Sequence, residues 1–469
     1  MILIASIMPI VALLGALTVF RLKAWQASLA ALAVGVASAV FAAGMPVCDI
    51  APTMFSGLLF ALCPICLVVL AALFVYAVTT ESGAMSRIRS DLASVSDDQR
   101  VLALLIVWGF GNFMEGMAGF GTAVAIPAAI LVGVGFDPFK AVTMCLVANT
   151  TSTAFGSVGV PLMTLSKESG CDLAGLVQMT VFVQLAITAA GPVLVLLMLG
   201  GFKALKGMWG WLSASSAAFL VPSMLASCFF GCELPDIVGG IGVMLVITCV
   251  SRRGKQPSSA SGKVVWAWQP FVFVVLLLAI NGLLPQSFKR YITPGALVLT
   301  GGFVGALAQG VRVKKLFSLL ADTFVRYLPA FATICLVVIL ARIMDESDMI
   351  SVIAGALVSL TGSAYPFFSA ALGALGGFIT GSGTSSCVLF GRLQAEVAAA
   401  LNESPSLLAA ANVMGAGIGK MICPQSIAIG TAAAGLVGRE SEIFKRMLPW
   451  FFCVILFACA LVSVAALFL

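Results

Sequence analysis

Runs of about 20 apolar residues follow one another along the whole of this 469-residue chain, separated by short polar breaks. A helix of that length crosses the roughly 30 Å hydrocarbon core of a bilayer. Charged residues make up 9% of the chain and hydrophobic residues 61%, whereas soluble domains carry roughly 25% charged residues. Because backbone groups in lipid must be hydrogen-bonded within their own segment, the pattern excludes a soluble fold and predicts an all-α polytopic membrane protein.

The apolar runs predict about twelve transmembrane helices, at residues 2–20, 24–44, 53–78, 139–160, 173–199, 209–230, 236–250, 266–284, 293–310, 324–342, 405–423 and 447–469. Two glycine-rich stretches, 101–136 and 365–401, remain. Each is interrupted midway by a cluster of glycines, so each is predicted to be a re-entrant hairpin.

The basic residues orient these predicted helices. If residues 21–23 are cytoplasmic, eighteen of the 25 lysines and arginines fall in cytoplasmic segments, and the opposite loops hold Lys167, Lys289 and Arg290. Cytoplasmic loops are enriched in Lys and Arg, so both termini are predicted to lie outside. Residues 251–265 are predicted to form a flexible basic linker on the cytoplasmic side.

The residue types exclude several classes of function. The chain has no histidine, which removes Ser-His triads, His-ligated zinc and imidazole proton relays. Its 13 cysteines are scattered and several lie inside apolar runs, so no disulfide framework is expected, and loop residues account for the net charge of +6. We therefore expect no enzyme activity, metal, cofactor or nucleic-acid partner, and membrane lipid as the surroundings. A homodimer is compatible with the sequence.

Three short patterns recur in the same order in the two halves of the chain. They are Glu81-Ser82 and Glu346-Ser347, Gly119-Phe120-Gly121-Thr122 and Gly381-Ser382-Gly383-Thr384, and Asn149 and Asn412, at offsets of 262 to 265 residues. Near-constant offsets indicate a duplication. An odd number of predicted crossings separates the copies, so we expect inverted repeats at 1–250 and 266–469, an architecture typical of secondary transporters.

Hydroxyl residues follow each glycine cluster directly. Thr122 comes after Gly121, and Thr384, Ser385 and Ser386 come after Gly383. Such residues can cap a new half-helix, whose free N–H groups favour a carboxylate ligand. Close helix packing by small residues is the alternative explanation for the glycines, and a plain cap the alternative for the hydroxyls.

Two asparagines lie midway along the predicted helices 139–160 and 405–423. Asn149 precedes Thr150, and both Asn149 and Asn412 are followed by further glycines, so each helix is predicted to unwind near its centre. The amides would then face a substrate in a site shared by the repeats. The alternative is that each Asn bonds a neighbouring helix.

Of the cationic residues, Arg392 and Lys420 fall well within predicted membrane segments, and Glu115 and Glu396 are the notable acids there. Burying a charge is costly, so each suggests a functional role. Arg392 and Glu396 are four residues apart and can pair on one helix face. Lys420 either balances the charge of a substrate or extends to the cytoplasmic interface. Glu115 is the predicted proton carrier, and a structural pair with Lys420 is the alternative.

Six stretches are specific enough to indicate a family. They are FMEGMAGFGTAVAIP (113–127), AILVGVGFDP (129–138), ANTTSTAFGSVGVP (148–161), ELPDI (233–237), ITGSGTSSCVLFGRLQ (379–394) and GKMICPQSIAIGTAAAGLVGRESE (419–442). With these the chain resembles the bacterial L-lactate permease family. The resemblance implies proton-coupled uptake of L-lactate, often with D-lactate and glycolate, through the cytoplasmic (inner) membrane. It also implies a scaffold domain and a transport domain that moves like an elevator.

The chain departs from the family motif Gly-Ser-Asp-Thr-Ser-Ser-Asn. Gly383 stands at the position of the Asp and Cys387 at that of the Asn, and Arg392 stands where a small or amide residue is usual. An acid is lost and a base gained near the expected site. Without this acid, Glu115 becomes the main candidate for proton coupling. The change is also compatible with a larger or more acidic substrate.

These features together predict a secondary active transporter that moves a proton with a small 2-hydroxymonocarboxylate. The predicted site consists of Gly121, Thr122, Asn149, Thr150, Thr384, Ser385, Ser386, Asn412, Lys420 and Gln425, with Glu115 as proton carrier. A sodium-coupled carboxylate transporter of similar fold is the main alternative. A channel and an intramembrane enzyme are further alternatives.

Overall fold

The computed structural model describes residues 2–18, 20, 22–119, 121–251, 261–283 and 293–468. In these ranges all regular structure is helical. Within the described residues, eight helices are long and apolar enough to cross a membrane, or nine if the bent pair Pro405–Lys420 and Pro424–Ala433 counts as one span. The prediction of an all-α multi-pass membrane protein is confirmed. The number twelve stays a prediction, because several expected crossings coincide with helices of 10–17 residues.

The first half of the chain contains fourteen α-helices within the described residues. They are α1 (Ile2–Thr18), α2 (Ala24–Phe41), α3 (Val47–Phe60), α4 (Leu67–Glu81), α5 (Ala84–Ala93), α6 (Gln99–Ala103), α7 (Asn112–Met117), α8 (Thr122–Gly133), α9 (Pro138–Ser152), α10 (Gly156–Ser169), α11 (Leu173–Gly200), α12 (Phe202–Leu205), α13 (Trp209–Phe230) and α14 (Pro235–Ser251). Short π- or 3₁₀-helical turns connect some of them: η1 (Ala61–Cys66), η2 (Leu104–Gly111) and η3 (Thr153–Phe155).

The second half continues with α15 (Ser261–Leu283), α17 (Pro294–Ala308), α18 (Val313–Glu346), α19 (Met349–Thr361), η4 (Gly362–Ala364), α20 (Tyr365–Thr380), α21 (Gly383–Leu401), α22 (Pro405–Lys420), α23 (Pro424–Ala433) and α24 (Glu440–Ala466). Phe120, the linker residues 252–260, and the loop residues Lys289 and Arg290 lie outside the described part of the chain.

Three predicted boundaries are wrong. The expected crossing 53–78 extends from Val47 to Glu81 and is interrupted at η1, where Cys63 has non-helical angles (φ −137°, ψ 111°). The expected crossing 324–342 is the middle of the 34-residue helix α18, whose charged ends the apolar reading left out. The linker was expected to reach residue 265, but α15 begins at Ser261.

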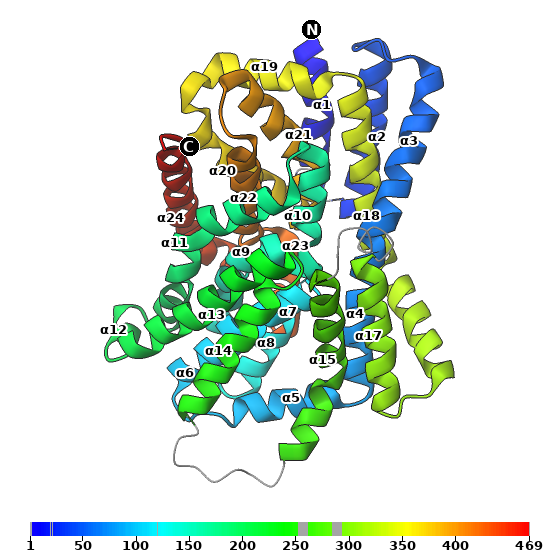
Figure 1. The fold of residues 1–469 in the computed structure, drawn as a ribbon. Coiled ribbons are helices and arrows are strands. Elements are labelled where there is room, and N and C mark those ends of the chain that lie inside the picture. Colours follow the sequence, from blue (N-terminus) through cyan, green and yellow to red (C-terminus); the bar gives the residue numbers. More distant parts are fainter. Residues whose placement is uncertain are drawn as a thin grey trace.

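The order of the elements recurs in the two halves (Figure 1). α4 and α18 each end at a glutamate, Glu81 and Glu346, and a residue with positive φ follows two positions later, Gly83 (75°) and Asp348 (57°). Each half then has a short helix, a two-legged helical hairpin, an interrupted helix and a long apolar helix, over α5–α11 and α19–α24. This order agrees with the duplication inferred from the sequence.

α22 lies at the centre of the fold and is unbroken. Every residue from Leu407 to Lys420 is buried, and the helix packs against α20, α21, α11 and α9. The predicted unwinding around Asn412 is therefore wrong. Gly415 and Gly419 keep helical geometry and lie against carbonyl groups of α20, and Gly417 lies against Thr150 of α9. The glycines of α22 therefore allow close helix packing instead of interrupting the helix.

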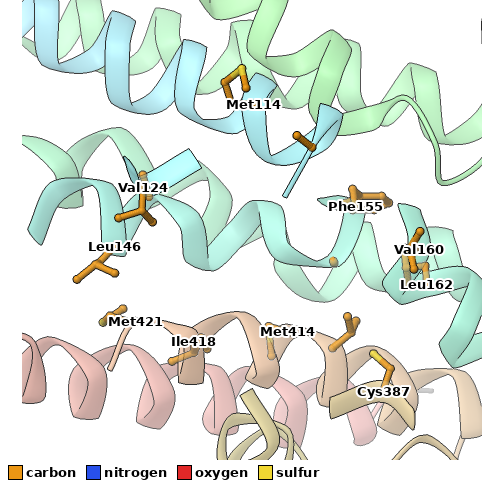
Figure 2. Close-up of a cluster of buried hydrophobic side chains, with 14 of the residues drawn as sticks. Met114, Val124, Leu146, Phe155, Val160, Leu162, Cys387, Met414, Ile418 and Met421 are labelled. Carbon is orange, nitrogen blue, oxygen red and sulfur yellow. The ribbon is translucent and has the colours of Figure 1, made fainter. Parts of the chain in front are cut away.

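Apolar side chains from both halves meet around this helix. Figure 2 shows Leu146 of α9 and, beyond it, Val124 of α8 on the side of α22 that carries Met414 and Ile418, with Met114 of α7 farther away. All five side chains are nearly inaccessible to solvent. The two halves thus share one apolar core, and polar groups within it need partners of their own.

Candidate functional site

The two hairpins turn at residues with left-handed backbone. In the first hairpin Gly119 (φ 60°) and Gly121 (φ 84°) separate α7 from α8, and in the second Gly381 (φ 65°) separates α20 from α21. A Cβ on Gly121 would lie 2.7 Å from Ile429 of α23, so glycine is needed there for space as well as for its φ. The first tip therefore fits directly against α23.

The interruption between α9 and α10 lies at residues 156–159. Ser157, Val158 and Gly159 have positive φ (48°, 60° and 75°), which is unusual for a serine and rare for a β-branched valine. The Ser157 hydroxyl donates to the carbonyl oxygen of Ala118 at 3.0 Å. This bond joins the break in the helix to the tip of the first hairpin.

A cavity of about 30 Å³ lies where the second hairpin tip meets this break. It is lined by Glu115, Thr153, Gly156, Ser157, Pro161, Gly381, Ser382, Gly383, Thr384 and Lys420. These residues come from α7, the α9–α10 break, the second hairpin tip and the end of α22. Segments far apart in the sequence, from both halves, therefore form one polar pocket.

Within the pocket a lysine and a glutamate form a buried ion pair. Lys420 Nζ lies 2.8 Å from Glu115 Oε1, and the side chains are 7% and 3% exposed. Asn149 completes the group: with its amide oriented to satisfy both neighbours, it donates to Glu115 Oε2 at 3.0 Å and accepts from Lys420 Nζ at 3.2 Å. Both charges thus have hydrogen-bonded partners, which a buried ion pair requires.

The start of α21 adds donors on another wall of the pocket. Ser382 caps the helix, accepting a bond from Ser385 N at 3.3 Å, and Gly383 and Thr384 are the first two residues. The first N–H groups of a helix have no partner within it, and the positive end of the helix dipole favours an anion. The pocket therefore combines a cation, helix-start N–H groups and hydroxyls, a donor set suited to a carboxylate.

Several predicted site residues lie elsewhere or have other roles. The Thr122 hydroxyl donates to Gly119 O at 2.8 Å, Thr150 to Val147 O at 2.7 Å and Ser386 to Gly373 O at 3.0 Å. These hydroxyls are therefore engaged by backbone of their own helix or hairpin. The expected capping roles are wrong too, because Gly121 and Ser382 occupy the N-cap positions of α8 and α21.

Asn412 and Gln425 also lie outside the lining of the pocket. Asn412 is fully buried, and neither amide atom has a hydrogen-bond partner among the described residues. The alternative reading, a bond from Asn412 to a neighbouring helix, is thus not found there either. Gln425 is exposed, with its amide oxygen beside Gly381 at the second hairpin tip.

The positions of Lys420 and Arg392 decide between the alternatives left open for the charged residues. Lys420 is buried and paired with Glu115, so its extension to the interface is wrong and the pairing is confirmed. Arg392, whose side chain is 45% exposed, pairs with Glu396 at 3.1 Å as the spacing predicts, and also with Asp345 of α18 at 3.3 Å. Arg392 therefore does not reach the pocket.

Sequence reasoning missed four polar residues near the pair: Thr153, Ser157, Ser382 and Asp236. The first three line the pocket. Ser157 and Ser382 each stand next to a glycine at an interruption, which is the signal that identifies them. Asp236 is buried beside Glu115, and the signal that identifies it is an acid at the first position of an apolar run.

Comparison with known proteins identifies the family. A profile described as L-lactate permease matches residues 2–308 and 285–469. The chain belongs to the L-lactate permease family. The L-lactate permease of Streptococcus iniae is 36% identical, over 87% of this chain and 93% of its own length. The glycolate permease GlcA of Escherichia coli K12 is 34% identical, over 94% and 91%.

The L-lactate permease of Bacillus subtilis strain 168 is 31% identical over 97% of this chain and 94% of its own length. Among solved structures, that of Neisseria gonorrhoeae MtrF covers 90% of this chain and 84% of its own, with 14% identity and a TM-score of 0.49. The family relatives are permeases, and the many apolar helices agree with a multi-pass membrane transporter.

Proposed function

We propose that this protein is a secondary active transporter that carries L-lactate and related 2-hydroxymonocarboxylates, glycolate and D-lactate among them, with a proton across the cytoplasmic membrane. The substrate class rests on relatives named L-lactate permease and glycolate permease. The observation that carries the mechanism is the buried Lys420–Glu115 pair in a pocket between the second hairpin tip and the α9–α10 break.

The substrate carboxylate takes the place of Glu115 as the partner of Lys420. Helix-start N–H groups at Gly383 and Thr384 hold the same carboxylate. The hydroxyl oxygens of Ser157 and Thr153, whose own protons are donated to Ala118 O and Asn149 O, accept a hydrogen bond from the 2-hydroxyl, and the Asn149 amide offers a further one. Glu115 loses its cationic partner in this exchange and takes up a proton, since an unpaired carboxylate is costly at this depth. One proton then accompanies each anion, and the loaded pocket is uncharged.

Movement of the surrounding elements is part of this proposal. A cavity of about 30 Å³ is about large enough for one or two water molecules, so a hydroxy acid enters only when the lining segments separate. We assign the hairpins and interrupted helices to a mobile transport domain, and α18 with its neighbours to a scaffold. The two inverted repeats, 1–250 and 266–469, supply both parts, and elevator-type movement exposes the pocket to each side in turn.

The proposal is tested with purified protein in proteoliposomes and a pH gradient, with choline replacing sodium throughout. Labelled L-lactate, D-lactate and glycolate are expected to accumulate, and a protonophore to abolish accumulation. Pyruvate and dicarboxylates serve as competitors that define the substrate class. Uptake that requires sodium would establish the sodium-coupled alternative instead, and uptake that only equilibrates would indicate a channel.

A further inference from the structure

A second buried carboxyl group lies beside the ion pair. Asp236 is the second residue of α14 and is 2% exposed. α14 packs on α7, and a Cβ on Gly116, the residue after Glu115, would lie 3.0 Å from Asp236 Cβ. Asp236 therefore interacts electrostatically with both Glu115 and Lys420. The site contains two acids and one base rather than one of each.

Asp236 lacks the partners that Glu115 has. Its Oδ2 atom is buried and has no hydrogen bond to any residue that the structure describes. Of the elements packed on α14, η2 contains no titratable group, α13 contributes only the exposed thiol of Cys228, and α7 contributes Glu115. The cation that Asp236 faces, Lys420, is already bound by Glu115 and Asn149.

The charges of this group do not balance if both acids are ionised. Glu115, Asp236 and Lys420 then carry a net charge of −1 at a place that solvent does not reach. Leaving such a charge uncompensated is costly, and one bound proton removes it. Glu115 has a close opposite charge and hydrogen bonds, whereas Asp236 is buried with its Oδ2 atom unpartnered, so the geometry places the bound proton on Asp236.

A second small cavity gives Asp236 a polar neighbourhood. It has a volume of about 20 Å³ and is lined in part by Asp236, Gln184 of α11, Thr151 of α9 and Ser223 of α13. The Nε2 group of Gln184 is also buried without a partner among the described residues. The volume suffices for one water molecule, which needs two or more polar partners of this kind.

We infer that Asp236 is a second proton-binding carboxyl group of the transport site, and that it is neutral while Glu115 is paired with Lys420. The inference rests on the proposed function for its consequence. When a substrate carboxylate binds Lys420, the incoming proton forms its O–H bond on Glu115, and Asp236 keeps the proton it already holds. The transported proton and the resident proton are thus on different residues.

Infrared spectroscopy of the full-length protein tests the inference without any transport assay. Wild type and D236N are compared at neutral pH in H₂O and D₂O. The difference spectrum is expected to contain the carbonyl stretch of a protonated carboxyl group, shifted in D₂O. The control E442Q removes an exposed glutamate paired with Arg439, and is expected to remove carboxylate bands only. Carboxylate bands lost in D236N would overturn the inference.

The folding of D236N provides a second test of the inference. An asparagine closely resembles a neutral aspartic acid, so D236N is expected to keep the wild-type thermal midpoint. A D236N protein that fails to fold, while E442Q folds, would show that the charge at residue 236 is needed and would also overturn the inference.

The pH dependence of KM for L-lactate exchange distinguishes proton binding by Asp236 from a purely structural role of this residue, which would not change it. In wild type, loss of the resident proton at alkaline pH adds a negative charge beside the anion site, and KM is expected to rise by about tenfold or more. In D236N the KM is expected not to show this part of the rise. A D236N profile of KM against pH that equals that of wild type would contradict the inference. If wild type exchanges no L-lactate, the proposed function fails, while the infrared result still decides the state of Asp236.

Discussion

At the scale of single residues, the stability of the site depends on Glu115 and Lys420 remaining together. Both are almost completely buried, and each is the charge partner of the other. Removing one member of a buried pair leaves an uncompensated charge, which typically destabilises a protein by about 3–5 kcal/mol. Removing both charges leaves no such penalty, so the two substitutions should not be additive.

We predict that K420M lowers the free energy of unfolding by about 3–5 kcal/mol, and that E115Q/K420M recovers most of this loss. The measurement is thermal or denaturant unfolding in detergent, read as a double-mutant cycle. R439Q, which breaks the exposed pair of Arg439 with Glu442, is the matched control and is expected to change stability little. Additive effects of E115Q and K420M would mean that the two charges do not interact.

The two asparagines at equivalent sequence positions should behave differently. Asn149 bonds both members of the ion pair, whereas the Asn412 amide has no partner among the described residues and does not line the pocket. A hydrogen bond to a charged group contributes about 1.5–3 kcal/mol, so N149A is expected to raise KM for L-lactate by about tenfold or more. N412A should change KM much less. The reverse order of effects in counterflow assays would place the substrate elsewhere.

At the scale of elements, the glycines of α22 are packing residues. A Cβ on Gly417 would collide with the carbonyl oxygen of Thr150, whereas a Cβ on Gly355 of α19 would meet nothing within 4 Å. We predict that G417A destabilises the protein by about 1–3 kcal/mol through overpacking. G355A should be neutral or stabilising by up to about 1 kcal/mol. Equal midpoints for both variants in a melting experiment would contradict the close approach of α9 and α22.

The sequence predicted the helices well where the composition of a segment alone determines its structure. It predicted them less well where packing against other helices determines the structure. The breaks predicted midway through 101–136 and 365–401 coincide with glycines that have positive φ, Gly121 and Gly381. The same residue type in α22 stays helical, because its neighbours approach from α20 and α9. No local signal distinguishes a glycine that breaks a helix from one that lets two helices touch.

The candidate site shows the same limit. Glu115 and Lys420 were identifiable, since a charge in an apolar run needs a reason. Their pairing joins residues 305 positions apart and depends on the tertiary fold. Sequence reasoning gave too much weight to Thr122 as a substrate ligand, because its hydroxyl donates to a backbone carbonyl of its own hairpin. Asp236 was missed, because the sequence does not reveal that α14 packs against α7.

At the beginning of the first hairpin, a local interaction fixes the start of helix α6. Asp98 accepts a bond from Arg100 N at 2.8 Å and caps α6. The Arg100 guanidinium bonds the same carboxylate and lowers the pKa of Asp98 below its ordinary value. Asp98 is thus ionised at neutral pH, and the cap is lost only as the pH falls through that lowered pKa.

At the scale of the whole molecule, ion pairs join the proposed scaffold to the proposed transport domain. Arg342 of α18 lies 3.2 Å from Glu168 of α10, and Arg392 of α21 lies 3.3 Å from Asp345 of α18. Both contacts must break or slide if the hairpins move past α18. The orientation of the molecule and a homodimeric assembly remain predictions from the sequence.

We predict that both termini lie outside the cytoplasm, because the basic residues gather in the alternate loops. Reporter enzymes that are active only outside the cytoplasm should be active when fused to either terminus. A fusion within residues 252–260 of the basic linker should be inactive. Activity of the linker fusion together with inactivity of the terminal fusions would reverse the orientation.

The central claim is that an anionic substrate exchanges for Glu115 on Lys420 and leaves Glu115 to take the transported proton. Its most direct test compares wild type with E115Q in proteoliposomes, measuring pH-driven accumulation and L-lactate exchange in the same preparation. We expect E115Q to exchange L-lactate but no longer to accumulate it. Accumulation by E115Q at the wild-type level would show that Glu115 does not carry the transported proton.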